Sequence, residues 1–365
     1  MSRWAHNFNP GPAALPASAL EQAQAELLDF QGTGLSILET SHRSPTYDQV
    51  HNDAIERLRR LLGLDESFTV LFMGGGARTQ FALAPMNLLG PGQAAEHIVT
   101  GKWSEVALDQ AQKVGCAREI WSSATTGHDR VPDPSEIEPS PDAAYVHFTS
   151  NNTTSGTRFA EPPATDGVPL VADMTSDLLT RPLDLAPYGL IYASAQKNVG
   201  PAGVTIVIAR TSLVEDAPSE LPDMFSYATM HAKNSMLNTP PVFAIYLVGL
   251  VAAHLEAEGG LAAQEQRNAR KAERLYNAID ASDGFYRGHA QSESRSPINV
   301  TFRLPTEELE SRFVTESADA GLVGLKGYKT VGGIRASLYN AVSLENVQAL
   351  VEFMDDFQSR HRADA

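Results

Sequence analysis

The sequence has little cysteine, a shortage of basic residues and no long apolar run, and each shortage excludes a class of protein. Cys116 is the single cysteine among 365 residues, which excludes an intramolecular disulfide and a cysteine-based metal cluster, and we expect no metal site. We interpret Cys116 as a small buried hydrophobic residue at the start of a strand. Lysine and arginine number 28 against 44 aspartates and glutamates, and the net charge of −16 disfavours a general nucleic-acid or membrane-surface role.

Membrane and export segments are also missing. The most apolar stretch, Val242 to Ala253, is shorter than the roughly 20 residues that a membrane span needs, so it predicts a buried core helix opened by two prolines. The residues at the N-terminus, "MSRWAHNFNPGPAALP", form no continuous apolar segment of the kind found in secretory signals, and we expect a cytoplasmic location. With 42% hydrophobic and 20% charged residues, the composition is that of a soluble globular protein of one large or two medium domains.

Helix-like and strand-like segments alternate in the first half of the chain, from about Pro16 to Arg210. A helix is predicted after Ser44, an N-cap, and Pro45, a favoured first residue, with Gly63 as its stop. Short apolar runs that favour strands occupy residues 68–73, 95–101, 143–150, 168–176, 188–196 and 204–210, and helices are predicted at 79–89 and 103–115. Strands that are apolar throughout, together with helices, predict a mostly parallel sheet covered on both faces.

The pattern changes after the apolar helix at 240–257. A long charged helix, a strand, a helix, a strand and a final helix are predicted at 261–282, 296–304, 306–321, 332–342 and 344–360. This alternation on a smaller scale predicts a second, α+β domain. We place the boundary near Gly259-Gly260, so that residues 16–259 form the large domain and residues 260–365, with the N-terminal segment 1–15, form the small one.

Four features are expected beyond the carboxyl ends of the strands, where open parallel sheets bind ligands. Glycines 74–76 lie between a strand and a helix and suit either an anion site or a plain tight turn. Asp173 ends an apolar strand, as a cap for the next segment or as the counter-ion of a buried cation. Lys197 follows a later strand, as one half of a structural ion pair or as a reactive amine. Trp103 follows another strand, where it plugs a core edge or stacks on a ring.

Together these features match the needs of pyridoxal phosphate. The cofactor requires a lysine for a Schiff base, an acid for its pyridinium nitrogen and a cradle for its phosphate. Lys197, Asp173 and the glycines could supply these three groups, and Asp173 precedes Lys197 by about one strand-to-strand crossover.

Eight segments distributed over essentially the whole chain make the sequence similar to the phosphoserine aminotransferase family. They are "NFNPGPAALP", "SHRSPTYDQV", "GGGARTQF", "TGKWS", "ADMTSD", "YASAQKNVGPAG", "NTPPVFAIYL" and "VGGIRASLYNA". The resemblance implies a class-V, fold-type-I pyridoxal phosphate enzyme with a large domain built on a mostly parallel seven-stranded sheet and a smaller α+β domain.

The resemblance also implies roles for residues of the cofactor site. Lys197 would bind the cofactor covalently, Asp173 would pair with the pyridinium nitrogen, Trp103 would stack on the ring and Thr153 would contact the ring hydroxyl. Further cofactor contacts are implied for Gly76, Ala77, Arg78 and Gln196, and for Asn238 and Thr239 reaching in from a second subunit. Sites shared in this way imply a homodimer.

The substrate site follows from the same resemblance. Arg335 would bind the α-carboxylate, a bidentate task that suits a guanidinium group. The distal anionic end of the substrate would be held by His42, Arg43 and Arg78. One departure stands out: the family commonly has a histidine-arginine pair where this chain has Tyr328 and Lys329. Lys329 is still expected to bind substrate, but affinity or substrate preference could shift.

The implied reaction transfers the amino group of L-glutamate to 3-phosphohydroxypyruvate, giving O-phospho-L-serine and 2-oxoglutarate in serine biosynthesis, with a further role in pyridoxine biosynthesis open. The main alternative is an aminotransferase for another small keto acid such as glyoxylate. A lyase of the cysteine desulfurase kind needs a mobile catalytic cysteine and is disfavoured, because Cys116 precedes a strand-like segment, "AREIW", away from all four features. A binding module without catalysis is the remaining reading.

Overall fold

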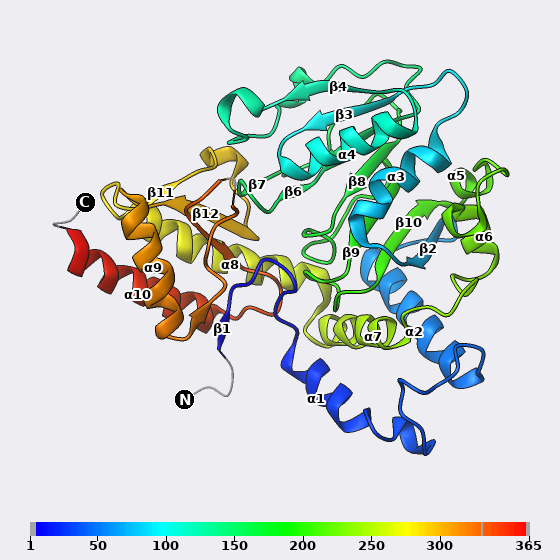
Figure 1. Cartoon of the computed structure of the whole chain (residues 1–365), viewed down its shortest axis with the longest axis horizontal. Coiled ribbons are helices and arrows are strands. Elements are labelled where there is room, and N and C mark those ends of the chain that lie inside the picture. The colour runs from blue at the N-terminus through cyan, green and yellow to red at the C-terminus, as the bar shows by residue number, and fades with distance from the viewer. Residues whose placement is uncertain (1–4, 330, 363–365) are drawn as a thin grey trace.

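A seven-stranded sheet forms the centre of the larger part of the molecule (Figure 1). The computed structural model describes residues 5–329 and 331–362. In spatial order the strands are β2 (Phe68–Met73), β10 (Thr205–Arg210), β9 (Tyr188–Ser194), β8 (Leu170–Asp173), β5 (Tyr145–Thr149), β3 (Ala95–Val99) and β4 (Ala117–Ser122). Strand β10 runs antiparallel to both of its neighbours, β2 and β9, whereas every other adjacent pair in this sheet is parallel. The prediction of a mostly parallel sheet is confirmed.

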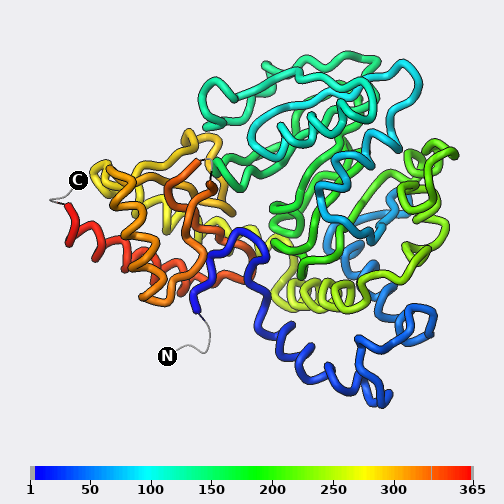
Figure 2. The backbone as a smooth tube through the Cα atoms, viewed as in Figure 1, coloured from blue at the N-terminus to red at the C-terminus, as the bar shows by residue number. Residues whose placement is uncertain are grey.

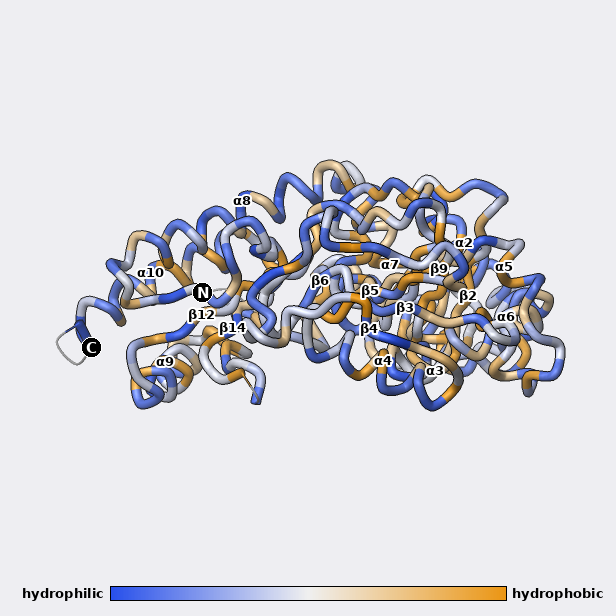
Figure 3. The backbone as a smooth tube through the Cα atoms, turned by 90° about the horizontal axis from the view of Figure 1, so that it is seen from above, coloured by the Kyte–Doolittle hydropathy of each residue, from blue (hydrophilic) through white to orange (hydrophobic). Residues whose placement is uncertain are grey.

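Each face of this sheet is buried under helices, as its apolar strands require. On one face, α2 (Pro45–Leu62) and α7 (Val242–Ala257) pack in a core that includes Ala172 of β8. On the other face, α3 (Gly76–Leu88) and α4 (Lys102–Val114) cover the neighbouring residue, Val171. Figure 3 shows the apolar strands inside and hydrophilic segments on the periphery.

The ends of α2 follow the predicted signals. The Ser44 hydroxyl accepts a hydrogen bond from the backbone N–H of Tyr47 at 3.2 Å, and Pro45 occupies the first turn. Gly63 ends the helix in the left-handed conformation at φ 66°, which glycine adopts without a steric penalty. The predicted helix and its limits are confirmed.

The prediction for Cys116 is wrong, because its side chain is exposed. Cys116 does precede a strand, β4, as expected. However, β4 is the last strand of the sheet, and its residues are exposed or half-buried rather than enclosed on both faces. An apolar run in the sequence does not distinguish such an edge strand from a central one.

A second core lies in the smaller part of the chain, where a three-stranded antiparallel sheet packs with helices. Its elements are α8 (Gly260–Asp280), β11 (Arg287–Gly288), β12 (Asn299–Arg303), α9 (Glu307–Asp319), β13 (Leu322–Val323), β14 (Ile334–Ser337) and α10 (Leu344–His361). The chain bends by 83° between α7 and α8. We propose that this bend, at Gly259-Gly260, is the boundary between the two domains.

The N-terminal segment connects the two parts (Figure 2). Strand β1 (His6–Asn7) pairs in parallel with β13, and Phe8 is buried in the second core. A few residues later, the backbone N–H of Ala13 donates to the carbonyl oxygen of Gln196 at 2.9 Å. This segment therefore spans from its pairing with β13 in the smaller part to the end of β9, next to Lys197.

The remaining elements lie outside these sheets and their covering helices. They are α1 (Ala17–Glu26), α5 (Thr211–Glu215), α6 (Tyr227–Ala232), the two-stranded β6 (Asn151–Asn152) and β7 (Thr157–Arg158), and short 3-10 turns at 30–32, 124–126, 134–136, 223–225 and 292–294. Within the described part of the chain, no helix is by itself long and apolar enough to cross a membrane. The pair α7 and α8 meets that test jointly, across its bend.

Candidate active site

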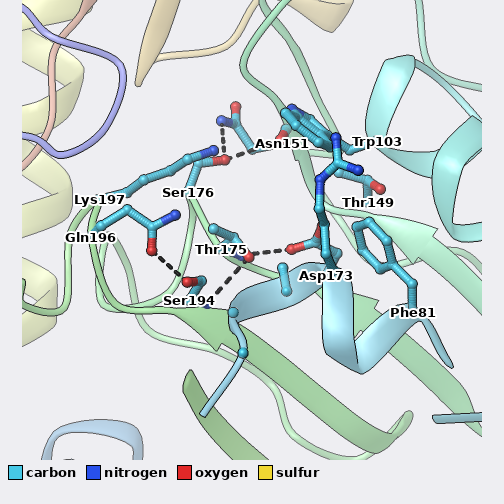
Figure 4. A pocket seen from close by; sticks show the side chains of 14 residues that line it. Phe81, Trp103, Thr149, Asn151, Asp173, Thr175, Ser176, Ser194, Gln196 and Lys197 are labelled. Carbon is cyan, nitrogen blue, oxygen red and sulfur yellow. Dashed lines mark hydrogen bonds between the residues drawn. The ribbon is translucent and has the colours of Figure 1, made fainter. Parts of the chain in front are cut away.

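A cavity of about 260 Å³ opens where β5, β8 and β9 end and where α3 and α4 begin (Figure 4). Among the residues proposed from the sequence, those that line it are Gly76, Ala77, Arg78, Trp103, Asp173, Gln196 and Lys197. They come from four separate stretches of the chain. The carboxyl ends of the parallel strands bring them together, as expected for an open α/β sheet.

The glycine turn forms one wall of the cavity. Gly75 and Gly76 adopt positive φ angles of 87° and 69°, and a side chain on Gly75 would meet the Thr79 hydroxyl at 2.0 Å. Helix α3 begins at Gly76 without any side-chain cap, so its first N–H groups are free. Free N–H groups at a helix N-terminus, bordering a cavity, favour a bound anion such as a phosphate.

Asp173 lies at the end of β8 with only 5% of its surface exposed. Its carboxylate accepts a hydrogen bond from the backbone N–H of Thr175 at 2.9 Å. Burial raises the pKa of Asp173, although the hydrogen bonds from Thr175 and the charge of Lys197 partly oppose this. Among the described residues no cation lies within ion-pair distance of Asp173, so the structure offers a buried acid that lacks a counter-ion.

Lys197 lies three residues after β9 and faces the cavity, as Figure 4 shows. Desolvation lowers the pKa of Lys197 to about 8; the charge of Asp173 opposes this change and that of Arg335 adds to it. A much larger fraction of this amine than of an ordinary lysine is therefore uncharged near neutral pH, and the uncharged amine is the nucleophile. The backbone around Gly11 approaches closely, since a side chain there would lie 3.4 Å from Cγ of Lys197.

Two orphaned polar atoms face the same region. The indole Nε1 of Trp103 and the hydroxyl of Thr149 are buried without a hydrogen-bond partner among the described residues. Thr149 lies beside Asp173 in the pairing of β5 with β8. Buried polar groups rarely stay unsatisfied, so this pattern indicates a polar ligand in the cavity.

Arg335 lies in β14 of the small sheet, next to the cavity rather than in its wall. Its side chain is 6% exposed, and Nη1 donates to the carbonyl oxygen of Thr153 at 3.0 Å. Nε has no partner, and no carboxylate among the described residues pairs with this guanidinium. Burial lowers the pKa of Arg335. A buried guanidinium without a carboxylate is a natural receptor for an anionic ligand.

The structure does not bring every proposed residue to the cavity. His42 and Arg43 lie in the turn before α2, and Asn238 and Thr239 are exposed in the segment before α7. Thr153 is buried, and its backbone carbonyl contacts Arg335. Lys329 is exposed beside a second groove, which Tyr328 and Arg303 also line.

Sequence reasoning missed several polar residues that line the cavity: Thr149, Asn151, Thr175, Ser176 and Ser194. Asn151 donates to the Ser176 hydroxyl at 2.8 Å, and the backbone N–H of Ser194 donates to the Thr175 hydroxyl at 3.3 Å. The available signal was position, because all of them lie at or just after the ends of β5, β8 and β9.

Comparisons with known proteins agree with this geometry. Residues 5–350 match the family model described as aminotransferase class-V. A phosphoserine aminotransferase of Desulfatibacillum aliphaticivorans is 54% identical over 359 residues, which covers 98% of each chain. The counterpart from Herpetosiphon aurantiacus is 49% identical over 355 residues, covering 97% of this chain and 99% of the relative.

Solved structures give the same result. The phosphoserine aminotransferase from Bacillus circulans subsp. alkalophilus superposes with a TM-score of 0.97 at 50% identity, covering 99% of this chain and all of the other. A structure of the Trichomonas vaginalis enzyme with bound pyridoxal phosphate superposes with a TM-score of 0.91 at 36% identity, covering 96% and 99% of the two chains. The chain has the fold-type-I architecture and belongs to the phosphoserine aminotransferase family of class-V aminotransferases.

Proposed function

We propose that this protein transfers the amino group of L-glutamate to 3-phosphohydroxypyruvate, releasing 2-oxoglutarate and O-phospho-L-serine, with pyridoxal phosphate as cofactor. The observation that carries the proposal is the placement of Lys197, Asp173 and the uncapped start of α3 around one cavity, with Arg335 unpaired beside it. Relatives of about 50% identity over nearly the whole chain bear the name of this activity.

The residues of the cavity fit the cofactor. Its phosphate suits the free N–H groups at Gly76 and Ala77, and its ring nitrogen suits the unpaired acid Asp173. Trp103 supplies an aromatic face, while Thr153 remains our proposal for the ring hydroxyl. When bound, pyridoxal phosphate supplies an aldehyde that takes up amino groups and a ring that accepts the electron pair left at the substrate's α-carbon.

Lys197 acts twice in this scheme. Its uncharged Nζ, with a pKa of about 8, would hold the cofactor through the aldehyde carbon, with release of water. When it is not bound to the cofactor, the same Nζ would accept the α-proton of the substrate as a general base and give that proton to the cofactor's former aldehyde carbon as a general acid.

Asp173 holds the proton on the ring nitrogen. A carboxylate favours the charged form of a neighbouring base, and burial strengthens this interaction because water does not screen it. Asp173 in turn is oriented by the backbone N–H of Thr175.

Cationic side chains select the substrates. Arg335 receives the α-carboxylate that glutamate and the keto acid share, and His42, Arg43, Arg78 and Lys329 are our proposal for the distal carboxylate or phosphate. Arg78 lines the cavity. Because the chain as a whole carries a charge of −16, these groups must attract an anion against the overall field.

We further propose that the protein works as a homodimer in the cytoplasm. Asn238 and Thr239 are exposed in a single chain, as residues that complete a partner's site would be. Leu28, Leu35 and Leu38 are 87%, 51% and 62% exposed, which supports a covered surface near the N-terminal segment. Activity that appears only on mixing Lys197→Ala chains with Asn238→Ala/Thr239→Ala chains would establish shared sites.

The decisive experiment measures amino transfer from glutamate by the cofactor-loaded protein. Acceptors would be 3-phosphohydroxypyruvate, hydroxypyruvate, pyruvate, glyoxylate and the phosphorylated threonine precursor of pyridoxine synthesis. A kcat/KM at least about 10²-fold higher for 3-phosphohydroxypyruvate than for hydroxypyruvate supports the proposal, since this corresponds to two phosphate hydrogen bonds. Equal or faster turnover of glyoxylate overturns it.

A further inference from the structure

Tyr328 lies between two side chains of the site. Its ring centroid is 6.5 Å from that of Trp103, with the planes inclined by 56°. On the other side, Cζ of Arg335 lies 5.9 Å from the centre of the Tyr328 ring, within the range of a cation–π interaction. Cζ of Arg78 lies 5.4 Å from the Trp103 ring. Two guanidinium groups are thus bridged by a pair of aromatic rings.

The backbone on both sides of Tyr328 is hydrogen-bonded. Backbone N–H groups of Val331 and Gly332 donate to the Tyr328 carbonyl oxygen at 2.9 and 2.8 Å, and Gly327 donates to Gly333 at 2.9 Å. A side chain on Gly327 would lie 2.0 Å from the Gly332 oxygen, so the two sides of the turn are in direct contact.

The base of the turn is fixed from a different strand and helix. Arg303 of β12 donates to the carbonyl oxygen of Val331 at 3.0 Å and pairs with Glu310 of α9. Glu310 also accepts a hydrogen bond from the backbone N–H of Gly333 at 3.1 Å. The backbone that carries Tyr328 is therefore tied to the small sheet through Val331 and Gly333.

The contact with Tyr328 leaves the hydrogen-bonding edge of Arg335 available. A guanidinium stacks through its face and donates through its edge, so both interactions can coexist. One edge nitrogen, Nη1, is used by Thr153, whereas Nε has no partner. The Tyr328 hydroxyl makes no hydrogen bond with any described residue, which leaves the ring as the interacting part.

We propose that Tyr328 is a positioning residue: its ring holds the Arg335 guanidinium in the orientation that receives the α-carboxylate of both substrates. The inference rests on the proposed function, in which Arg335 binds that carboxylate. It assigns the ring, rather than the hydroxyl, as the feature that matters. It also separates the role of Tyr328 from that of Lys329, whose exposed ammonium is a point charge with three donors and has no ring.

The test compares Tyr328→Phe, which keeps the ring, with Tyr328→Leu, which removes it, and with Tyr328→Gln as a second variant without a ring. The control is Tyr276→Leu, because the Tyr276 ring also has an arginine over it, with Cζ of Arg295 at 4.5 Å from the ring centre, in a region away from the cavity. Glutarate, an unreactive dicarboxylate, would be titrated calorimetrically into each cofactor-loaded protein, and KM and kcat would be measured for both half-reactions.

We expect Tyr328→Leu and Tyr328→Gln to raise the Kd of glutarate and both KM values about 2- to 30-fold, with a smaller effect on kcat. Tyr328→Phe and Tyr276→Leu should stay within about 2-fold of the original protein. Unchanged glutarate binding without the ring overturns the inference, and so does a Tyr328→Phe variant as weak as Tyr328→Leu. Glutarate binding needs no turnover, so failure of the original protein to transaminate 3-phosphohydroxypyruvate would count against the proposed function separately.

Discussion

Arg335 donates a hydrogen bond to the carbonyl oxygen of Thr153, and this 3.0 Å contact joins the small sheet to the turn between β6 and β7 of the larger part. The two residues are 182 positions apart in the sequence. This contact fixes the position of the guanidinium proposed to bind substrate relative to the ends of β5 and β8, where Asp173 lies. A change at Arg335 should affect substrate binding before it affects the cofactor.

Arg335→Lys replaces a fork of donors with a single ammonium group. We expect kcat/KM for glutamate to fall about 10- to 100-fold, because one charge-assisted hydrogen bond to the α-carboxylate is lost. The absorption band of the lysine-bound cofactor should be unchanged, since Arg335 lies outside the cavity wall. Steady-state kinetics and a spectrum of the same sample test both points. A variant that loses activity only with the phosphorylated acceptor would indicate that Arg335 binds the distal phosphate and not the α-carboxylate.

Lys197→Ala should abolish the covalent cofactor band while the protein remains folded. Lys271 provides a matched control, because burial lowers its pKa to about 7 as well, yet its Nζ donates to the carbonyl oxygens of Leu338 and Tyr339. Lys271→Met should keep the band and lower the free energy of unfolding by about 1–3 kcal/mol, the cost of buried unpaired acceptors. Spectra with borohydride trapping, together with urea titrations, separate the two lysines. A band that survives in Lys197→Ala would refute the assignment.

The rate of cofactor capture should depend on pH through Lys197. The pKa of this group is lowered from 10.5 to about 8, so the reactive uncharged amine accumulates as the pH rises through 8. For a free primary amine of ordinary basicity, the rate of reaction with the cofactor should instead keep rising up to about pH 10.4. The rate would be measured by stopped-flow mixing of cofactor-free protein with pyridoxal phosphate, and again with butylamine in place of the protein. The titrations of the cofactor itself are common to both reactions and cancel in the comparison. Identical pH profiles for protein and butylamine would contradict the lowered pKa.

A buried ion cluster formed by Asp177, Arg158 and Arg181 should contribute to the free energy of unfolding. The Asp177 carboxylate lies 3.1 Å from Arg158 and 3.7 Å from Arg181. Asp177→Asn leaves two guanidinium groups without their counter-charge and should cost about 3–5 kcal/mol, measured by chemical unfolding. Asp280→Asn breaks an ion pair with Arg295 in which the aspartate is 53% exposed, and should cost at most about 1 kcal/mol. Equal losses in the two variants would mean that burial is not the deciding factor.

The same cluster has a defined pH dependence. Burial alone would raise the pKa of Asp177, but the charges of Arg158 and Arg181, together with hydrogen bonds from Thr180 and Ser150, outweigh it and hold the pKa below its usual value. The stabilisation is therefore complete above the pKa of the unfolded state and is lost as the pH falls. The unfolding free energies of the original protein and of Asp177→Asn should therefore converge as the pH falls below about 4.

The parts of the site that lie at strand ends could be predicted from the sequence. Asp173 and Lys197 each follow an apolar run, and parallel strands bring such positions to one edge. The antiparallel direction of β10 could not be predicted, because an apolar run carries no direction. The exposure of Cys116 was missed for a similar reason, since the order of strands in the sheet is set by the fold.

The contribution of the small sheet to the site could not be predicted from sequence patterns. Arg335 was proposed by resemblance alone, and its contacts with Thr153 and Tyr328 depend on how two separate cores meet. The polar lining at Thr149, Thr175 and Ser194 was also missed, because single threonines and serines are common at strand ends for local hydrogen bonding.

The pairing of β1 with β13 has a consequence for synthesis. His6 lies opposite Leu322, so a strand pairs with one that is made roughly 300 residues later. At about 5–20 residues per second, β1 must wait roughly 15 to 60 seconds after its own synthesis for β13. The segment beside Lys197 therefore leaves the ribosome well before the strand that holds it in place.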